Sequence, residues 1–244
     1  MVRTLKSRLR KYFWKMLKVR WTLNSDINII IENDNDWFVF NEIFTNREYD
    51  RVFEWLPEKI NNPLVLDLGA NVGYFALRMA DEFLARKIKD FTLYSIEASS
   101  HNYEQLQLRV NQDQLIGKCN AIHSLVGYKQ GSSFLTTQTD HFGYHINGKD
   151  DGAEKVNFIN IEDMLRNDPR RITLLKCDIE GSEQIFLSEY GLLLKNTDLA
   201  IFEFHGGECD VEICRKYLAN AGLEYIETLK TDPRYKTSVE IFKR

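Results

Sequence analysis

The sequence predicts an α/β protein with a doubly wound, mostly parallel β-sheet. Three observations support this fold class. Short apolar stretches alternate with amphipathic helical patterns along the 244 residues, a glycine-containing turn follows the stretch 64–68, and acidic residues end several of the apolar stretches. Alternating strands and helices are typical of parallel sheets whose crossovers are right-handed.

The first 25 residues are predicted to form a basic amphipathic helix. Residues 1–20 contain eight of the 32 lysines and arginines and no acid, which leaves the remainder with 24 basic and 36 acidic residues. Leu5, Leu9, Phe13 and Leu17 recur every four residues. Two interpretations stay open: the helix lies on an anionic membrane surface or docks to a partner, or its apolar stripe packs on its own domain.

Residues 26–62 form a lead-in to the main domain, which spans residues 63–244. In the lead-in, 27–32 and 37–40 are predicted strands and 46–56 is a predicted helix. The main domain has strand patterns at 64–68, 91–98, 120–127, 172–181, 198–205, 223–229 and 238–244, the last two as an antiparallel pair. Its helical patterns are 72–83, 99–110, 183–194 and 209–222, with Gly222 as a stop. Residues 127–160 are predicted to form a hairpin and loop excursion.

Polar residues gather where the predicted strands end. Asp67, Glu97, Asp178 and Glu203 each stand at or near the end of a different strand. Ligands of open parallel sheets bind beyond the carboxyl ends of the strands. Any one of these acids could be a helix cap or a surface ion pair, but four at one sheet edge indicate a binding site.

The turn after the first strand of the main domain indicates which ligand binds there. Gly69 and Gly73 expose backbone N–H groups at a helix start, and Glu97 is placed to accept hydrogen bonds from a ribose diol. Asn71 and Tyr74 stand where a dinucleotide fingerprint needs glycines, and Asp67 would repel a diphosphate. S-adenosylmethionine, with a ribose, a sulfonium, an amino acid and no phosphate, therefore fits better than a dinucleotide.

Four motifs resemble the FkbM-type methyltransferases, which are class I S-adenosylmethionine-dependent enzymes. They are "VLDLGANVGYFAL", "IEASSHNYEQLQLRVN", "LLKCDIEGSE" and "FEFH". The resemblance implies a seven-stranded, Rossmann-like sheet with a reversed last strand, and methylation of an oxygen on a sugar, lipid or secondary metabolite. It assigns the methionine moiety to the turn 67–73 and the ribose to Glu97. Ala98 departs from the family pattern, which usually has proline there. The predicted cofactor-binding residues are Asp67, Gly69, Asn71, Gly73, Tyr74, Glu97, Ala98 and Asp178.

Methylation of a hydroxyl needs a group that takes the acceptor proton. Asp178, Glu180 and His205 are the candidate catalytic residues, with Asp178 or His205 as the base. No metal ligand is assigned, although Asp178, Glu180, Glu203 and His205 would be plausible ligands if their strand ends converge. His141, Phe142, Tyr144 and His145 belong either to a flap that binds the acceptor or to an ordinary exposed loop.

Composition narrows the remaining alternatives. The acidic body argues against a nucleic-acid partner, and no apolar run has the length of a membrane span. Four scattered cysteines and the lack of a secretory signal predict a cytoplasmic protein, with peripheral contact at the inner face of a membrane through residues 1–20. The expected partner is a small-molecule or glycan acceptor. The competing functions are a nicotinamide-dependent dehydrogenase and a catalytically silent adaptor that binds a partner or membrane through its basic helix.

Overall fold

The computed structural model describes residues 12, 14, 16, 19–137, 144–147 and 153–244. The apolar stripe of the predicted N-terminal helix lies outside these residues. Within them, β1 (Val19–Thr22) pairs antiparallel with β2 (Asn28–Ile31), so the helix predicted to reach residue 25 is wrong over its last part. The branched and aromatic side chains of Val19 and Trp21 favour this extended conformation.

The main sheet has seven strands in the order β11-β12-β10-β9-β3-β4-β5. Its strands are β3 (Leu64–Leu68), β4 (Thr92–Glu97), β5 (Cys119–His123), β9 (Ile172–Cys177), β10 (Leu199–His205), β11 (Glu224–Asp232) and β12 (Thr237–Lys243). The last strand, β12, runs antiparallel to both of its neighbours, and the pairs among β10, β9, β3, β4 and β5 are parallel. The predicted fold class, including the reversed last strand, is confirmed.

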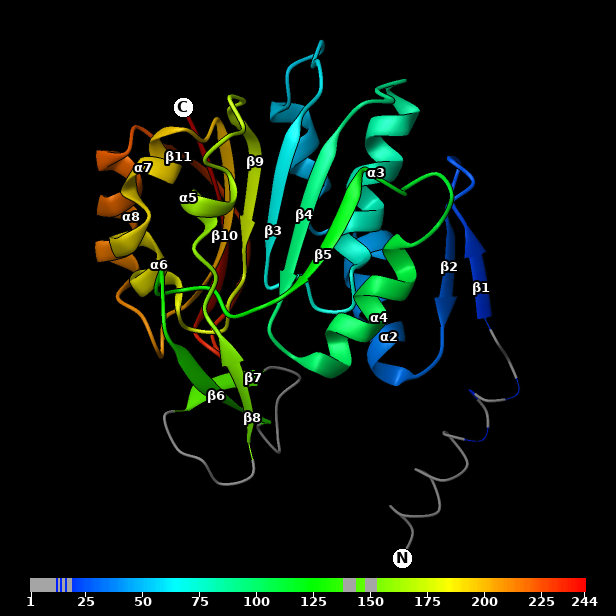
Figure 1. Ribbon diagram of the computed structural model, residues 1–244, viewed down its shortest axis with the longest axis horizontal. Helices are drawn as coiled ribbons and strands as arrows, with labels where there is room; N and C mark the ends of the chain where they lie inside the picture. Colours follow the sequence, from blue (N-terminus) through cyan, green and yellow to red (C-terminus); the bar gives the residue numbers. More distant parts are fainter. Residues whose placement is uncertain (1–11, 13, 15, 17–18, 138–143, 148–152) are drawn as a thin grey trace, which may run out of the picture.

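Helices cover both faces of the main sheet (Figure 1). They are α2 (Asp34–Phe40), α3 (Tyr74–Ala85) and α4 (Ser100–Val110) on one side, and α5 (Ile161–Met164), α6 (Glu183–Glu189), α7 (Gly191–Lys195) and α8 (Val211–Asn220) on the other. Each layer buries its own core, one around Phe75 and Phe83 of α3 and the other around Phe186 and Leu218. The helix predicted over 183–194 is divided at Tyr190 into α6 and α7.

The excursion after β5 forms a second, three-stranded antiparallel sheet. Its strands are β6 (Ser132–Thr137), β7 (Tyr144–Asn147) and β8 (Glu154–Asn157), in the order β7-β6-β8. Figure 1 shows this small sheet beyond the end of β4, and a bridge between Leu125 and Phe158 joins the two ends of the excursion. The described part of the excursion is therefore a small sheet next to the carboxyl ends of the main strands.

Two expectations for the lead-in differ from the structure. Residues 37–40 are helical, because the Asn33 side chain accepts a hydrogen bond from the Asp36 backbone N–H and caps α2. The π-helix η1 (Asn41–Thr45) continues α2. The helix predicted over 46–56 is the shorter 3₁₀-helix η2 (Asp50–Trp55).

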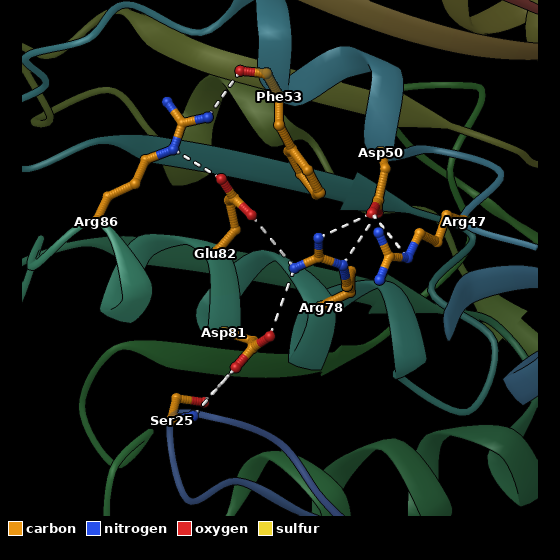
Figure 2. Close-up of polar contacts among 8 residues, drawn as sticks. All are labelled: Ser25, Arg47, Asp50, Phe53, Arg78, Asp81, Glu82 and Arg86. Atoms are coloured by element: carbon orange, nitrogen blue, oxygen red, sulfur yellow. Dashed lines mark hydrogen bonds and ion pairs between the residues drawn. The ribbon is translucent and has the colours of Figure 1, made fainter. Parts of the chain in front are cut away.

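An ionic network attaches the lead-in to α3 (Figure 2). The guanidinium of Arg78 donates to both carboxylate oxygens of Asp50, at 3.0 and 2.9 Å, and also contacts Asp81 and Glu82. The Ser25 hydroxyl donates to Asp81 at 2.7 Å. The network fixes the segments before β3 against the helix that begins at the glycine turn.

Candidate active site

The turn between β3 and α3 exists because it contains residues that accept left-handed backbone angles. Gly69, Asn71 and Gly73 have φ of 74°, 49° and 92°. A Cβ at position 69 would lie 1.6 Å from the carbonyl oxygen of Asp178, so only glycine lets β3 and β9 approach this closely. The chain order reverses between these two strands, which is where ligands of doubly wound sheets bind.

Asp67 stabilises this turn indirectly, through Lys176. Its side chain is fully buried, and Oδ1 lies 3.4 Å from the ammonium of Lys176, its register partner on β9. Lys176 also donates to the carbonyl oxygen of Gly69 at 3.1 Å and lies 3.6 Å from Asp178. Burial raises the pKa of Asp67 although Lys176 opposes the shift. Asp67 does not line the cleft described below, and it is linked to the turn through Lys176.

Glu97 connects the ends of β3 and β4. Its Oε2 accepts a hydrogen bond from the backbone N–H of Asn71 at 2.8 Å, and its Oε1 accepts one from Ser99 at 2.9 Å. The side chain is 7% exposed, and burial raises its pKa to about 7 although the two backbone hydrogen bonds lower it. Each oxygen keeps a lone pair that could accept a hydrogen bond from a hydroxyl group.

A cleft of about 610 Å³, partly open to solvent, lies along these strand ends. It brings together five of the predicted cofactor-binding residues: Gly69, Asn71, Glu97, Ala98 and Asp178. Glu180 lines it too, together with Ile96, Asn102, Ser124, Leu125, Val126, Leu135 and Ile179. The cleft therefore has a polar side near β3 and β9 and an apolar side near β5 and β6.

Tyr74 and Gly73 do not line this cleft. Tyr74 is 1% exposed and packs edge-on against Phe40 and Phe44, and its hydroxyl accepts a hydrogen bond from Arg109 at 3.3 Å. A Cβ at Gly73 would lie 2.7 Å from a methyl carbon of the Leu106 side chain. Both residues hold α3 in place, so their predicted contact with the cofactor has no support in the geometry.

The other candidate catalytic residues meet at the ends of β9 and β10. Asp178, Glu180 and His205 each place one polar atom within 4.8 Å of the others. Although burial lowers the pKa of His205, hydrogen bonds with Glu180 and Glu183 outweigh it and raise the pKa to about 12. A protonated imidazole cannot take up a further proton, so the contacts of His205 with Glu180 and Glu183 leave Asp178 as the better candidate base.

Several residues of the site have no clear signal in the sequence. Asn102, Ser124 and Leu135 line the cleft, but no local pattern distinguishes them. Glu183, a helix-start acid in the sequence, is fully buried and contacts His205 Nδ1 at 3.0 Å. The position of Glu183, two residues after Gly181, was the sequence feature that could have indicated this contact. Of the predicted flap, His141 and Phe142 lie outside the described residues.

A seven-stranded sheet of this order, with a cleft at the switch between β3 and β9, is the fold of S-adenosylmethionine-dependent methyltransferases. The sequence pattern described as "Methyltransferase FkbM domain" matches residues 67–225, about two thirds of the chain. The chain belongs to this family. No curated protein matches the sequence.

Solved structures agree with this fold. The methyltransferase FkbM from Methylobacillus flagellatus KT is similar over 85% of this chain and 53% of its own, with 14% identity and a TM-score of 0.54. Fibrillarin from Aeropyrum pernix, solved with natively bound S-adenosyl-L-methionine, is similar over 93% of this chain and 83% of its own, with 12% identity and a TM-score of 0.50. This chain thus spans about half of the Methylobacillus protein. Among the described residues, no helix is long and apolar enough to cross a membrane.

Proposed function

We propose that the protein transfers a methyl group from S-adenosylmethionine to a hydroxyl oxygen of a small-molecule or glycan acceptor. The observation that carries the proposal is the hydrogen bond between the buried Glu97 carboxylate and the Asn71 backbone N–H at the mouth of the cleft. It holds the Glu97 carboxylate, which we propose accepts the ribose hydroxyls, next to the glycine turn. Family membership supports the reaction class.

The residues that line the cleft fit the parts of this cofactor. Glu97 would accept the ribose hydroxyls with its remaining lone pairs. Gly69 and Asn71, which line the cleft next to Glu97, would hold the methionine part through their backbone. The apolar side, formed by Ile96, Leu125, Val126 and Leu135, would receive the adenine. When bound, the cofactor supplies an electrophilic methyl group.

Asp178 is the proposed base. It lines the cleft at its polar side, and its side chain is 25% exposed, so an acceptor can reach it. When the hydroxyl oxygen is methylated, Asp178 would take the hydroxyl proton. Holding the two reactants in line at about 3 Å can lower the barrier by roughly 7–11 kcal/mol.

A binding experiment tests the cofactor assignment. Thermal unfolding is followed with S-adenosylmethionine, S-adenosylhomocysteine or NAD present. A ligand at about 100 times its dissociation constant adds roughly 2.7 kcal/mol of stability. We expect a rise in Tm with the first two ligands. A rise with NAD alone would support a dehydrogenase instead, and no rise in a folded, cofactor-free sample would support the adaptor.

A second experiment identifies the acceptor. Candidate hydroxyl compounds, grouped as free sugars, lipid-linked sugars and secondary metabolites, are incubated with methyl-labelled donor and analysed by mass spectrometry. We expect label on an oxygen of one class. Label on nitrogen or carbon would contradict the proposed oxygen chemistry while leaving cofactor binding intact.

The basic N-terminal segment is proposed to bring the enzyme to an anionic membrane surface. Its eight basic residues and lack of acids support this role, because each such charge near an anionic bilayer contributes about 1 kcal/mol. Vesicle co-sedimentation is compared for the full chain and for a form without residues 1–20. Equal sedimentation of both forms would remove the segment from membrane binding.

A further inference from the structure

A compact group of oxygen and nitrogen donors lies at the ends of β9 and β10, beside the polar side of the cleft. Asp178 and Glu180 follow β9, His205 ends β10, and their three ligand atoms lie within 4.8 Å of one another. This approaches the spacing of two ligands on one metal ion, since each ligand lies about 2.0–2.2 Å from the ion. The geometry points to a divalent cation bound by Asp178, Glu180 and the Nε2 of His205.

Glu183 orients the imidazole for this role. Its Oε1 lies 3.0 Å from Nδ1 of His205, and Nε2 lies 3.3 Å from Oε2 of Glu180. A carboxylate that holds one ring nitrogen directs the other at the metal, as in most histidine–metal sites. A cation among the three donors would replace the proton that Nε2 shares with Glu180.

Glu183 also fixes the loop that carries the other two donors. The same Oε1 accepts hydrogen bonds from the backbone N–H groups of Ile179 at 3.3 Å and Gly181 at 3.1 Å. Glu180 and Gly181 have φ of 51° and 97°, a left-handed bend that faces Glu180 toward His205. The conformation of this loop is thus determined by Glu183, a side chain that does not line the cleft.

The charge balance of the group is consistent with a missing positive partner. Glu183 is fully buried, and its Oε2 makes no hydrogen bond among the described residues. Three carboxyl groups here face one imidazole and the ammonium of Lys176. A buried carboxylate without full compensation is costly, and a cation nearby offsets that cost.

The donor set and its exposure indicate which cation binds and how. Two carboxylates and one imidazole combine ligands preferred by Mg²⁺ and Mn²⁺ with one preferred by later transition metals, which favours Mn²⁺. The side chains of Asp178, Glu180 and His205 are 25%, 39% and 15% exposed, so open coordination positions remain. Asp178 gives the ion one carboxylate oxygen and keeps the other for the acceptor proton. Because the group adjoins the proposed methyl-transfer site, the bound ion would supply a Lewis acid for the acceptor hydroxyl, and this part of the inference rests on the proposed function.

Titration of Mn²⁺ into the full chain, followed by the paramagnetic resonance signal of the free ion, tests the site directly. We expect one ion per chain, at least tenfold weaker binding in Glu180→Gln and His205→Gln, and unchanged binding in Glu189→Gln, an exposed acid on α6. Glu183→Gln should lose roughly 10- to 100-fold as a positioning residue. Glu180 is partly exposed, so its variant keeps the test valid if the His205 variant unfolds.

Two outcomes would overturn the inference: no Mn²⁺ binding at millimolar concentration, or equal binding by the native chain and Glu180→Gln. S-adenosylhomocysteine binding is measured in the same samples. Retained cofactor binding without Mn²⁺ binding would reject the cation and leave the proposed methyl transfer standing. If the native chain does not bind S-adenosylhomocysteine, the proposed function is rejected instead.

Discussion

The carboxylate of Glu97 accepts a 2.8 Å hydrogen bond from the backbone N–H of Asn71, 26 residues earlier in the chain. Glu97, the proposed ribose-binding acid, is therefore coupled to the glycine turn. Asn71 has a left-handed φ of 49°, and its N–H points at Glu97. A change at Glu97 should consequently disturb both the ribose contact and the turn.

Glu97→Gln should weaken cofactor binding roughly 10- to 100-fold, the value of one or two hydrogen bonds to a charged group. Glutamine offers one acceptor oxygen where the carboxylate offers two, so either Asn71 or Ser99 loses its partner. Calorimetric titration with S-adenosylhomocysteine measures the effect. Glu104→Gln, an exposed change on α4, is the control. Native affinity in the Glu97 variant would show that the ribose lies elsewhere.

Cofactor binding should also depend on pH through Glu97. Burial raises its pKa to about 7, so much of the carboxyl is protonated at pH 6 and ionised at pH 8. Because the ionised form accepts hydroxyl hydrogen bonds better, affinity should rise by up to about tenfold over this interval.

Stability of the cofactor-free protein should change in the opposite direction. The folded pKa of Glu97 lies above its usual value of 4.5, so the folded state holds the proton more tightly. This contribution is complete below pH 4.5 and is lost as pH rises through 7. Cofactor titrations and unfolding curves at pH 6, 7 and 8 measure both effects. In Glu97→Gln, the affinity and the free energy of unfolding should change much less with pH. If they change as little in the native chain, Glu97 is already ionised over this interval.

Local patterns predicted the sheet and the turn because they are encoded by neighbouring residues. The apolar stretch 64–68 and the glycines after it determine a strand and a turn without help from distant segments. The rule that ligands bind at strand ends then located the cleft. Residues 37–40 were mispredicted because the Asn33 cap, outside that stretch, overrode its β-propensity.

Contacts between strands could not be predicted in the same way. Asp67 looked like a ligand contact, but its register partner on β9 is Lys176, and that pairing buries it. His205 looked like a free base, but the ends of β9 and β10 bring Glu183 against its ring. In both cases a residue remote in sequence decides the role, and one sequence does not specify the register.

Gly69→Ala should destabilise the protein by at least about 3 kcal/mol, because a left-handed residue acquires a side chain and that Cβ meets the Asp178 carbonyl at 1.6 Å. Gly117→Ala is the matched control, with φ of 77° and no atom within 4 Å of the added Cβ. Gly117→Ala should lose only the about 1–2 kcal/mol of stability that a left-handed backbone costs a residue with a side chain. Urea unfolding measures both, and equal losses would show that β3 and β9 can separate at little cost.

Arg78→Met should destabilise the lead-in by roughly 1–3 kcal/mol. The substitution leaves Asp50, Asp81 and Glu82 facing one another at 14–19% exposure, without the guanidinium that they share.

Arg166→Met removes an exposed pair with Asp163 and should cost at most about 0.5 kcal/mol, which makes it the control. Arg78→Lys keeps the charge without the two-pronged contact to Asp50 and should fall between the two. Chemical unfolding and proteolysis before β3 report on the network. If Arg78→Met is as stable as Arg166→Met, the lead-in is held by its apolar contacts with α3 rather than by these charges.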